Sequence, residues 1–342
     1  MPTRQLHHPL RVLVTGAGGP AGLGLIRQYQ DARHEVYAVD MDPRAAGLHL
    51  VPDEQRALVP AGSHRHFGAR LYALCEEWGI DVLVPTVDVE LTAVARRRTN
   101  FSRIGTRCVL ALDETLATSL DKVALAETCR SKVPVPRTEA LLESFDLSRW
   151  QFPFVAKPRS GSGGRGVRII RSPTDFRGIP LDGSYLVQEY LPGEEYSVDV
   201  FADQNGQVRA TVPRVRLKVD SGVAVAAKTV HDPQIEKYAR AVAHVLRLRF
   251  VANIQFKRST SGVPTLLEVN PRFPGTMAIT VASGVNMPAL AIQAATGFTL
   301  WRDEYPFEEI AMVRYLDDLV VPATAFDASE REDEPLVRGA AS

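Results

Sequence analysis

The residues with the clearest chemical character lie in two segments near the C-terminal end of the chain, VANIQFKR and PTLLEVNPRF. Both segments predict β-strands, and the STSG between them predicts a turn. Along the second strand Glu268, Asn270 and Arg272 alternate, so their side chains project from one face of the sheet. An acid, an amide and a guanidinium in a row are costly on a face that serves for packing. The pattern therefore indicates a polar site, to which Gln255 on the first strand can contribute.

This combination of side chains predicts a magnesium site. Carboxylate and amide oxygens suit Mg²⁺, which takes phosphate oxygens and water as its other ligands. The guanidinium of Arg272 suits a phosphoryl group in transfer. We therefore expect Gln255, Glu268 and Asn270 to hold the metal. An exposed edge strand with scattered polar residues is the alternative.

The segment FPFVAKPRSGSGGRGVRII has the features of a phosphate-binding loop. An apolar strand ends in Lys157, and a loop containing Gly161, Gly163, Gly164 and Gly166 leads back into a strand. Glycines let backbone N–H groups approach a polyphosphate, and the lysine supplies a point charge. The segment differs from a P-loop, which runs from strand to helix and carries Lys and Ser or Thr after its last glycine. We expect a lid over phosphates, with a plain glycine-rich hairpin as the alternative.

The segment YLVQEYLPGEEYSVDV predicts two strands joined by a turn, with Glu189 and Glu195 six positions apart across it. Such a hinge can offer backbone groups to an adenine edge while a carboxylate holds the ribose hydroxyls. The alternative for both acids is a solvated strand end.

The N-terminal segment RVLVTGAGGPAGLGLIRQYQ, followed by HEVYAVD, predicts a strand, a glycine turn, a helix and a second strand that ends on Asp40. This order is typical of dinucleotide-binding units and would support an NAD(P)-dependent oxidoreductase. However, Gly16, Gly18 and Gly22 follow a spacing one residue longer than the dinucleotide fingerprint. The glycine turn alone is therefore a weak argument for a dehydrogenase.

The elements around these segments change character along the chain. From residue 10 to about 112, strands alternate with helical patterns, which predicts a parallel sheet covered on both faces. A helix over ETLATSLDKVALAETC follows, and the prolines of KVPVPRT indicate extended backbone near a domain boundary. Between residues 154 and 258 we expect antiparallel strands and one helix, DPQIEKYARAVAHVL. The predicted fold class is α/β plus α+β.

Composition narrows the functional classes. The 342 residues are 45% hydrophobic, enough for two or three domains. The 40 basic and 40 acidic residues cancel, so we expect neither nucleic acid nor a membrane as a partner. The dispersed Cys75, Cys108 and Cys129 predict reduced, core-packing thiols of a cytoplasmic enzyme. Because no apolar run is long enough, we expect no signal peptide and no membrane-spanning helix.

Five motifs, DKVALAE, FVAKPRSGSGGRGV, QEYLPGEEYSVD, NIQF and LLEVNPRF, resemble in their order and spacing the ATP-grasp superfamily. The resemblance is strongest to its single-copy carboxylate–amine ligases, which are similar to half of the carbamoyl phosphate synthase large subunit. It extends from about Arg11 to Gly297. It implies a Rossmann-like (pre-ATP-grasp) N-terminal domain, which holds no dinucleotide and helps to form the acceptor site, followed by a two-lobed ATP-grasp fold. We place these parts at 1–115 for the N-terminal domain, 116–190 for the small lobe with its lid, 191–322 for the C-terminal lobe with the metal site and 323–342 for a flexible tail.

The resemblance also implies which residues bind ATP. Lys122 and Lys157 would contact the phosphates, and Glu195 would hold the ribose. The loop that closes over the phosphates would contribute Ser160, Gly161, Ser162, Gly163, Gly164 and Gly166. The adenine would lie against the hinge formed by Gln188, Glu189, Tyr190 and Leu191.

For catalysis the resemblance implies two magnesium ions, with Mn²⁺ as an alternative ion. Glu268 would bridge them, with Gln255 on the first ion and Asn270 on the second. Many family members carry a carboxylate at the position of Gln255, and the amide resembles carbamoyl phosphate synthase. The implied catalytic residues are Arg272, Lys157 and Lys228, with Lys228 of VAVAAKTVHD directed toward the γ-phosphate.

The implied reaction is the activation of a carboxylate. The carboxylate would attack the γ-phosphate of ATP, and an amine would capture the acyl phosphate to give an amide or peptide. Amino-acid-like substrates would contact Arg272 and the segment PTVDVEL through Thr86, Asp88 and Glu90. Asp88 or Glu90 would bind an amino group, with a helix N-cap as the alternative for Asp88. A homodimer is compatible with this class. An NAD(P)-dependent oxidoreductase and an inactive nucleotide-binding module are the alternative functions.

Overall fold

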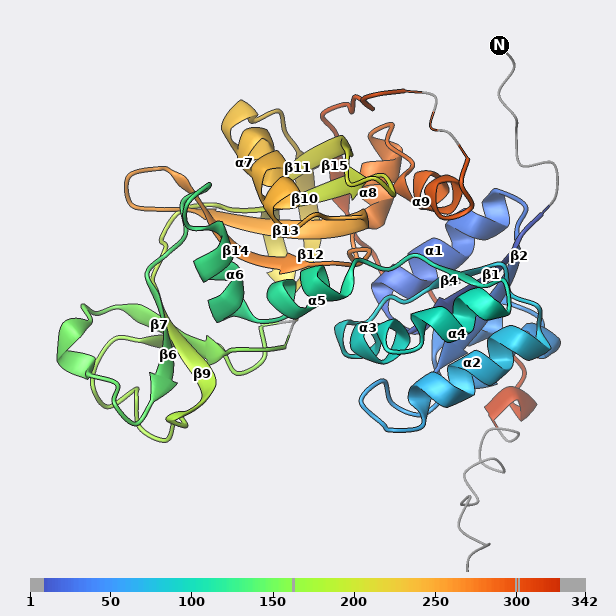
Figure 1. The fold of residues 1–342 in the computed structure, drawn as a ribbon, viewed down its shortest axis with the longest axis horizontal. Helices are drawn as coiled ribbons and strands as arrows, with labels where there is room; N and C mark the ends of the chain where they lie inside the picture. Colours follow the sequence, from blue (N-terminus) through green and yellow to red (C-terminus); the bar gives the residue numbers. More distant parts are fainter. Residues whose placement is uncertain (1–8, 162–163, 299, 301, 327–342) are drawn as a thin grey trace, which may run out of the picture.

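A computed structural model describes residues 9–161, 164–298, 300 and 302–326, and contains three sheets. The N-terminal domain lies at one end of the molecule, a small four-stranded lobe lies at the other, and a six-stranded sheet lies between them (Figure 1). This arrangement confirms the predicted α/β domain followed by a two-lobed α+β fold.

The N-terminal sheet is parallel throughout, with the order β3-β2-β1-β4-β5. Successive residues of its central strand enter different cores: Val12 and Val14 pack toward α1, and Leu13 packs toward α2 and α3. Both faces are thus buried, which explains the apolar runs of these strands. The elements are β1 (Arg11–Thr15), α1 (Pro20–Asp31), β2 (Glu35–Asp40), η1 (Ala46–Leu50), η2 (Asp53–Gln55), β3 (Arg56–Leu58), α2 (Phe67–Glu77), β4 (Val82–Val84), α3 (Asp88–Ala95), α4 (Arg98–Arg103) and β5 (Arg107–Cys108).

The glycine turn after β1 is filled by the chain itself. A Cβ on Gly22 would lie 2.3 Å from the carbonyl oxygen of Gly16, and one on Gly18 would lie 2.8 Å from the Cβ of Ala45. The Asp40 carboxylate accepts a hydrogen bond from the Gly18 backbone N–H at 2.8 Å. The glycines and this acid are therefore explained by internal packing, without a dinucleotide.

The two lobes that follow are antiparallel, as predicted. The small-lobe sheet has the order β6-β9-β7-β8 and an aromatic core that includes Trp150 and Phe154. The large-lobe sheet has the order β14-β13-β10-β11-β12-β15, and α6 and α7 cover one of its faces. The small lobe contains β6 (Thr138–Leu142), η3 (Leu147–Arg149), β7 (Phe154–Pro158), β8 (Arg168–Ile170) and β9 (Asp182–Glu189). The large lobe contains β10 (Glu195–Ala202), β11 (Val208–Asp220), β12 (Val223–Thr229), α7 (Pro233–Val245), β13 (Phe250–Arg258), β14 (Pro264–Asn270) and β15 (Ala311–Val313).

The helix predicted after Asp113 is two helices, α5 (Asp113–Ser119) and α6 (Lys122–Cys129). Asp121 interrupts them, because its carboxylate accepts from the first backbone N–H groups of α6 and also pairs with Arg159 at 2.7 Å. Although α6 lies within the predicted small lobe, its apolar side chains pack into the core of the large lobe.

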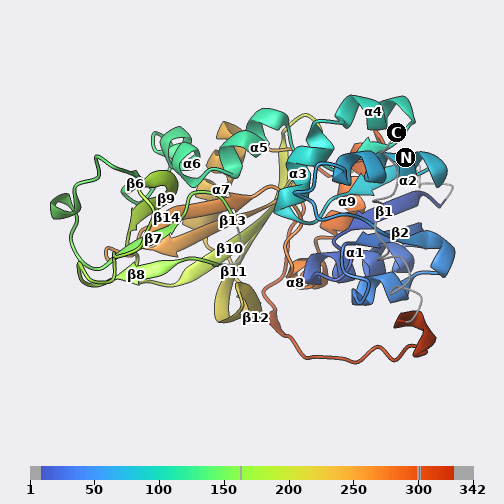
Figure 2. The same cartoon turned by 90° about the horizontal axis from the view of Figure 1, so that it is seen from below.

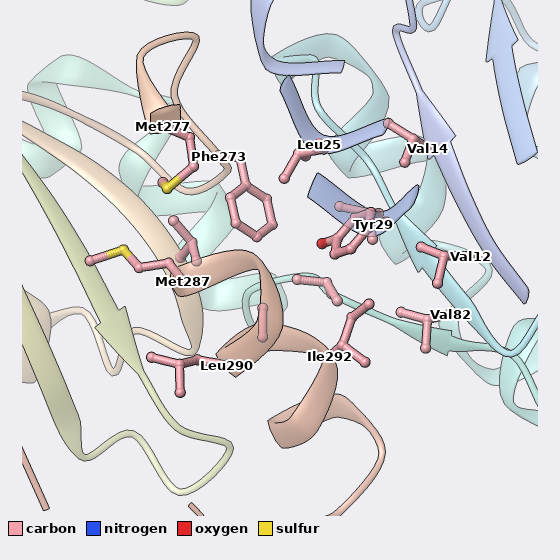
Figure 3. Packing of buried hydrophobic residues seen from close by; sticks show 14 of the residues in the cluster. Val12, Val14, Leu25, Tyr29, Val82, Phe273, Met277, Met287, Leu290 and Ile292 are labelled. Carbon is pink, nitrogen blue, oxygen red and sulfur yellow. The ribbon is translucent and has the colours of Figure 1, made fainter. Parts of the chain in front are cut away.

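The N-terminal domain and the large lobe share one hydrophobic core. Leu25 and Tyr29 of α1 face Phe273 and Ile292 across it (Figure 3). On the large-lobe side, α9 (Met287–Ala295) contributes most of the buried side chains of this core, and α8 (Met277–Ala282) adds Met277.

The chain then returns to the N-terminal domain (Figure 2), where the ring of Phe326 lies 5.7 Å from that of His49. The rest of the predicted tail, 327–342, lies outside the described residues. Cys75 and Cys129 are free and buried, and Cys108 is free and partly buried. Within the described ranges, none of the helices combines the length and apolar character needed to cross a membrane.

Two glycines of α1 test the account of the glycine turn. We expect Gly22→Ala to lower the free energy of unfolding by roughly 1–3 kcal/mol or more, because the new methyl group would clash with backbone. The methyl group of Gly24→Ala, in the same helix, would meet no atom within 4 Å, so this substitution should raise the free energy of unfolding by about 0.5–1 kcal/mol. Chemical unfolding of both variants is the measurement. Equal effects would contradict the packing account.

Candidate active site

A cavity of about 830 Å³ lies where the three parts of the molecule meet. The large-lobe sheet forms its floor, the small lobe covers it, and the starts of α1 and α3 close the side nearest the N-terminal domain. The structure brings most of the predicted site residues together here: Thr86, Asp88, Lys122, Lys157, Ser160, Gly161, Gly164, Gln188, Glu189, Tyr190, Leu191, Glu195, Gln255, Glu268, Asn270 and Arg272.

The three residues proposed for the metal lie side by side on the floor. Glu268 of β14 is directly opposite Gln255 of β13, so both side chains project from the same face. The amide nitrogen of Asn270 donates to the Glu268 carboxylate at 3.2 Å, which leaves the amide oxygen available. The described residues gather no cluster of three His, Cys, Asp or Glu side chains. One carboxylate with two amides fits Mg²⁺ when phosphate and water complete the coordination.

Two buried lysines lie on the small-lobe side of the cavity. Lys122, at the start of α6, donates to the carbonyl oxygen of Gly161 at 2.7 Å and so ties the glycine loop to the helix. Lys157 is 8% exposed at the end of β7. Burial lowers the pKa of Lys157 to about 8, and the carboxylate of Glu268 opposes this shift. An anionic phosphate would favour the charged form of Lys157.

Sequence reasoning missed a pair of arginines on β11. Arg216 donates to the Glu195 carboxylate at 2.5 Å and to the side-chain oxygen of Gln255 at 3.3 Å. It therefore joins the acid proposed for the ribose to the amide proposed for the metal. Arg214, two positions earlier on the same face, pairs with Asp199 at 2.8 Å. Their alternation in VPRVRLK was the available signal, of the same kind as that in LLEVNPRF.

Arg272 is held by the N-terminal domain. Its Nε and Nη2 donate to the two carboxylate oxygens of Asp88 at 2.7 and 2.6 Å. This bidentate ion pair is largely buried, with 17% of the Arg272 side chain and 10% of the Asp88 side chain exposed. Asp88 lies in the first turn of α3, so the pair connects that helix to the segment that follows β14.

Lys228 does not line the cavity, so the structure does not support its predicted direction toward the γ-phosphate. It is exposed on β12 directly opposite Val215 of β11. Side chains alternate along a strand, so Val215 and Lys228 project from the face opposite to that of Arg214 and Arg216. The α-carbon of Gly166 also lies outside the cavity lining, against Pro158 and Tyr185. Ser162 and Gly163 lie outside the described residues.

Glu90 is also absent from the cavity lining, so its predicted contact with substrate is not supported. Its side chain is buried behind β1, where the Thr15 hydroxyl donates to its carboxylate. Burial raises the pKa of Glu90 to about 7, against the opposing effect of the Thr15 hydrogen bond. Asp88 and Glu90, two positions apart in α3, therefore have different environments. Asp88 faces the cavity, and Glu90 faces the sheet.

These features define the class of the protein, which is a parallel-sheet domain followed by a two-lobed ATP-grasp fold. Residues 182–319 match the family model described as "ATP-grasp in the biosynthetic pathway with Ter operon". Residues 12–109 match the model "PylC-like, N-terminal domain". The chain therefore carries an ATP-grasp domain over residues 182–319 and a PylC-like N-terminal domain over residues 12–109.

Curated relatives are similar to this chain over part of their length. The chain is 26% identical over 165 residues to the carbamoyl phosphate synthase large chain of Clostridium acetobutylicum, a match that covers 44% of this chain and 15% of that protein. Identity to the D-alanine–D-alanine ligase of Clostridium botulinum is 24% over 160 residues, or 42% of this chain and 53% of that one. The 3-methyl-D-ornithine–L-lysine ligase of Methanosarcina mazei is 25% identical over 168 residues, and this match covers 47% of this chain and 44% of that protein. The chain thus spans about half or less of the length of these relatives.

A solved structure supports the fold assignment. The N5-carboxyaminoimidazole synthetase of Staphylococcus aureus, complexed with ADP, matches with a TM-score of 0.72 at 15% identity. The match covers 94% of this chain and 85% of that one.

The Asp88–Arg272 pair predicts a stability effect. Asp88→Asn keeps the shape but removes the charge, so Arg272 is left largely buried without its counter-ion. We expect the free energy of unfolding to fall by about 1–3 kcal/mol. The control is Glu114→Gln, which breaks the ion pair between Glu114 and Arg247. Because both of these side chains are mostly exposed, this substitution should change the free energy of unfolding very little. A variant Asp88→Asn as stable as this control would contradict the role of the pair.

Glu90 predicts a pH-dependent effect. Its pKa is about 7 in the folded chain against an ordinary value of 4.5, so between these values the folded state keeps a proton that the unfolded chain has lost. Stability contributed by Glu90 is therefore complete below pH 4.5 and is lost as the pH rises through 7. Glu90→Gln should be more stable than the unmodified chain above pH 7, by at most about 3 kcal/mol, with the difference vanishing near pH 4.5. Chemical unfolding of both proteins across this pH range is the measurement. A stability difference between them that is independent of pH would contradict the prediction.

Proposed function

We propose that this protein is an ATP-dependent ligase that activates a carboxylate as an acyl phosphate and joins it to an amine. The observation that carries the proposal is the gathering of Lys122, Lys157, Glu268, Asn270 and Arg272 around one cavity on an ATP-grasp fold. Two of the relatives are named as ligases of amino acids or amino-acid-like molecules, which supports amino-acid-like substrates here. No side-chain nucleophile is required.

The chemistry consists of two displacements. An oxygen of the substrate carboxylate forms a bond to the γ-phosphorus while the bond to the β,γ-bridging oxygen breaks, so ADP leaves. The amine nitrogen then forms a bond to the acyl carbon, phosphate leaves with the bonding electrons, and the nitrogen loses a proton. The products are an amide or peptide, ADP and phosphate.

The nucleotide would lie across the cavity. Gln188, Glu189, Tyr190 and Leu191 would hold adenine at the hinge, and Glu195, oriented by Arg216, would hold the ribose. Lys122 and Lys157 would contact the phosphates, and the loop over Ser160–Gly166 would exclude water that could hydrolyse the acyl phosphate.

The floor supplies the charge for phosphoryl transfer. Arg272, held in place by Asp88, would stabilise the negative charge on the phosphoryl group. Gln255, Glu268 and Asn270 would hold Mg²⁺, with two ions proposed and Mn²⁺ as an alternative ion. When bound, the metal supplies positive charge to the phosphate oxygens.

Substitution of Glu268 distinguishes an active ligase from an inactive nucleotide-binding module. Phosphate release with Mg·ATP is screened over pairs of carboxylates and amines, with amino acids first. With a productive pair, Glu268→Gln should lower turnover by at least about 100-fold, or roughly 3 kcal/mol of transition-state stabilisation, because it removes the only charge that the proposed metal ligands carry. ADP binding, measured by thermal shift, should persist.

Glu77→Gln, on an exposed position of α2, is the matched control and should retain full turnover. Near-normal turnover of Glu268→Gln would remove the proposed metal site. Stabilisation of the protein by NADH and not by Mg·ATP would overturn the ligase proposal itself.

A further inference from the structure

A row of four polar side chains crosses the floor of the cavity. The strand register places Glu268 opposite Gln255, Gln255 opposite Ser197, and Ser197 opposite Arg214. All four residues line the cavity. Adjacent strands lie about 4.8 Å apart, so the two ends of the row are separated by about 14 Å at the backbone. A chemical group bound beside Glu268 is therefore distinct from one bound beside Arg214.

Arg214 is built rigidly into its end of the row. Its side chain is 2% exposed and its partner Asp199 is fully buried. Asp199 also accepts from Asn253 at 2.7 Å and from Thr280 at 2.5 Å, which fixes its position. A buried ion pair of this kind contributes little net stability compared with apolar packing, so its presence indicates another role.

The guanidinium retains unused donors. Of its five N–H groups, one bonds Asp199 and another bonds Thr276, and in the described structure Nε has no hydrogen-bond partner. Buried donors without partners are costly, so a ligand that accepts from them would be favoured.

The beginning of α1 lies at the same end of the cavity. Gly19, Pro20 and Ala21 line it, and the Cβ that Gly275 would carry lies 3.2 Å from Pro20. Within the described structure no side chain caps this helix, and its first turn contains no acidic residue. The N-terminus of a 12-residue helix therefore adds partial positive charge beside Arg214. Asp88, the nearby acid, is already neutralised by Arg272.

We propose that Arg214 and the N-terminus of α1 form a subsite for a second, unreacted carboxylate on the amino-acid-like substrates. The inference rests on the proposed ligase function and specifies its substrate class: the amine is an amino acid whose own α-carboxylate is bound by this subsite. The planar arginine donors suit a carboxylate. Fixing that group would direct the amine toward the acyl phosphate.

The test measures binding and does not depend on turnover. The full chain with Mg·ADP is titrated calorimetrically with each common amino acid and with the matching α-carboxamide. We expect at least one amino acid to bind, and its carboxamide to bind at least about tenfold more weakly. A carboxamide that binds as well as the acid overturns the subsite. A panel in which ADP binds and no amino acid does also overturns it, while phosphate release with other substrates would leave the ligase proposal standing.

A variant that should fold well locates the subsite. Gly19 has φ −76° and ψ 157°, which any residue adopts, and an added Cβ would lie 3.4 Å from its nearest neighbour. Because aspartate is a favourable N-cap, Gly19→Asp places a carboxylate at the helix start without endangering the fold. Gly19→Asp should weaken amino-acid binding at least about tenfold, because the two carboxylates repel. Gly19→Asn has the same shape without the charge and should change the affinity less than about threefold.

ADP affinity is the folding control for both variants. Arg214→Lys keeps the positive charge that Asp199 requires but loses the planar donors. It should therefore also weaken amino-acid binding at least about tenfold. Equal amino-acid affinities of Gly19→Asp and Gly19→Asn would overturn the assignment.

Discussion

The hydrophobic core shared by α1, α8 and α9 determines how the rest of the molecule can work. The large-lobe sheet is the floor of the cavity, and this core fixes the N-terminal domain against the large lobe (Figure 3). Apolar burial is non-directional, so packing alone brings the domains together without setting their register. The bidentate pair between Asp88 and Arg272 adds direction, because both distances and the plane of the guanidinium must be satisfied.

Paired charges organise the floor in the same way. Glu195 pairs with Arg216, Asp199 with Arg214, and Asp88 with Arg272. Ion pairs with little solvent exposure cost desolvation energy that their attraction only partly offsets, so three such pairs around one cavity, of which Glu195–Arg216 is the most exposed, are poorly explained by stability. They hold charged donors in fixed positions before any ligand arrives, which is the condition for electrostatic catalysis and for selective binding. Each pair lies in a different one of the regions proposed for the ribose, the phosphoryl group and the acceptor substrate.

The N-terminal domain illustrates how a familiar pattern can serve a different purpose. Its strand, glycine turn and helix have the order of a dinucleotide site, yet the space beside Gly18 and Gly22 is occupied by backbone and by Ala45. Asp40, which could have bound a ribose, accepts from the backbone of the turn. The same turn leaves the start of α1 uncapped at the cavity, where it can act on a substrate.

The order of the domains, the strands that carry the site and the common direction of Glu268, Asn270 and Arg272 could be predicted from the amino-acid sequence alone. These follow from local rules, since side chains alternate along a strand and glycine, proline and capping residues act within a few positions. The remaining features of the site depend on how distant segments of the chain pack together. The pairing of β11 with β12 turned Lys228 away from the cavity, and the close packing of α3 against β1 buried Glu90 behind Thr15. Asp88 and Arg272 lie 184 positions apart, and no local pattern relates residues whose contact depends on how two domains pack.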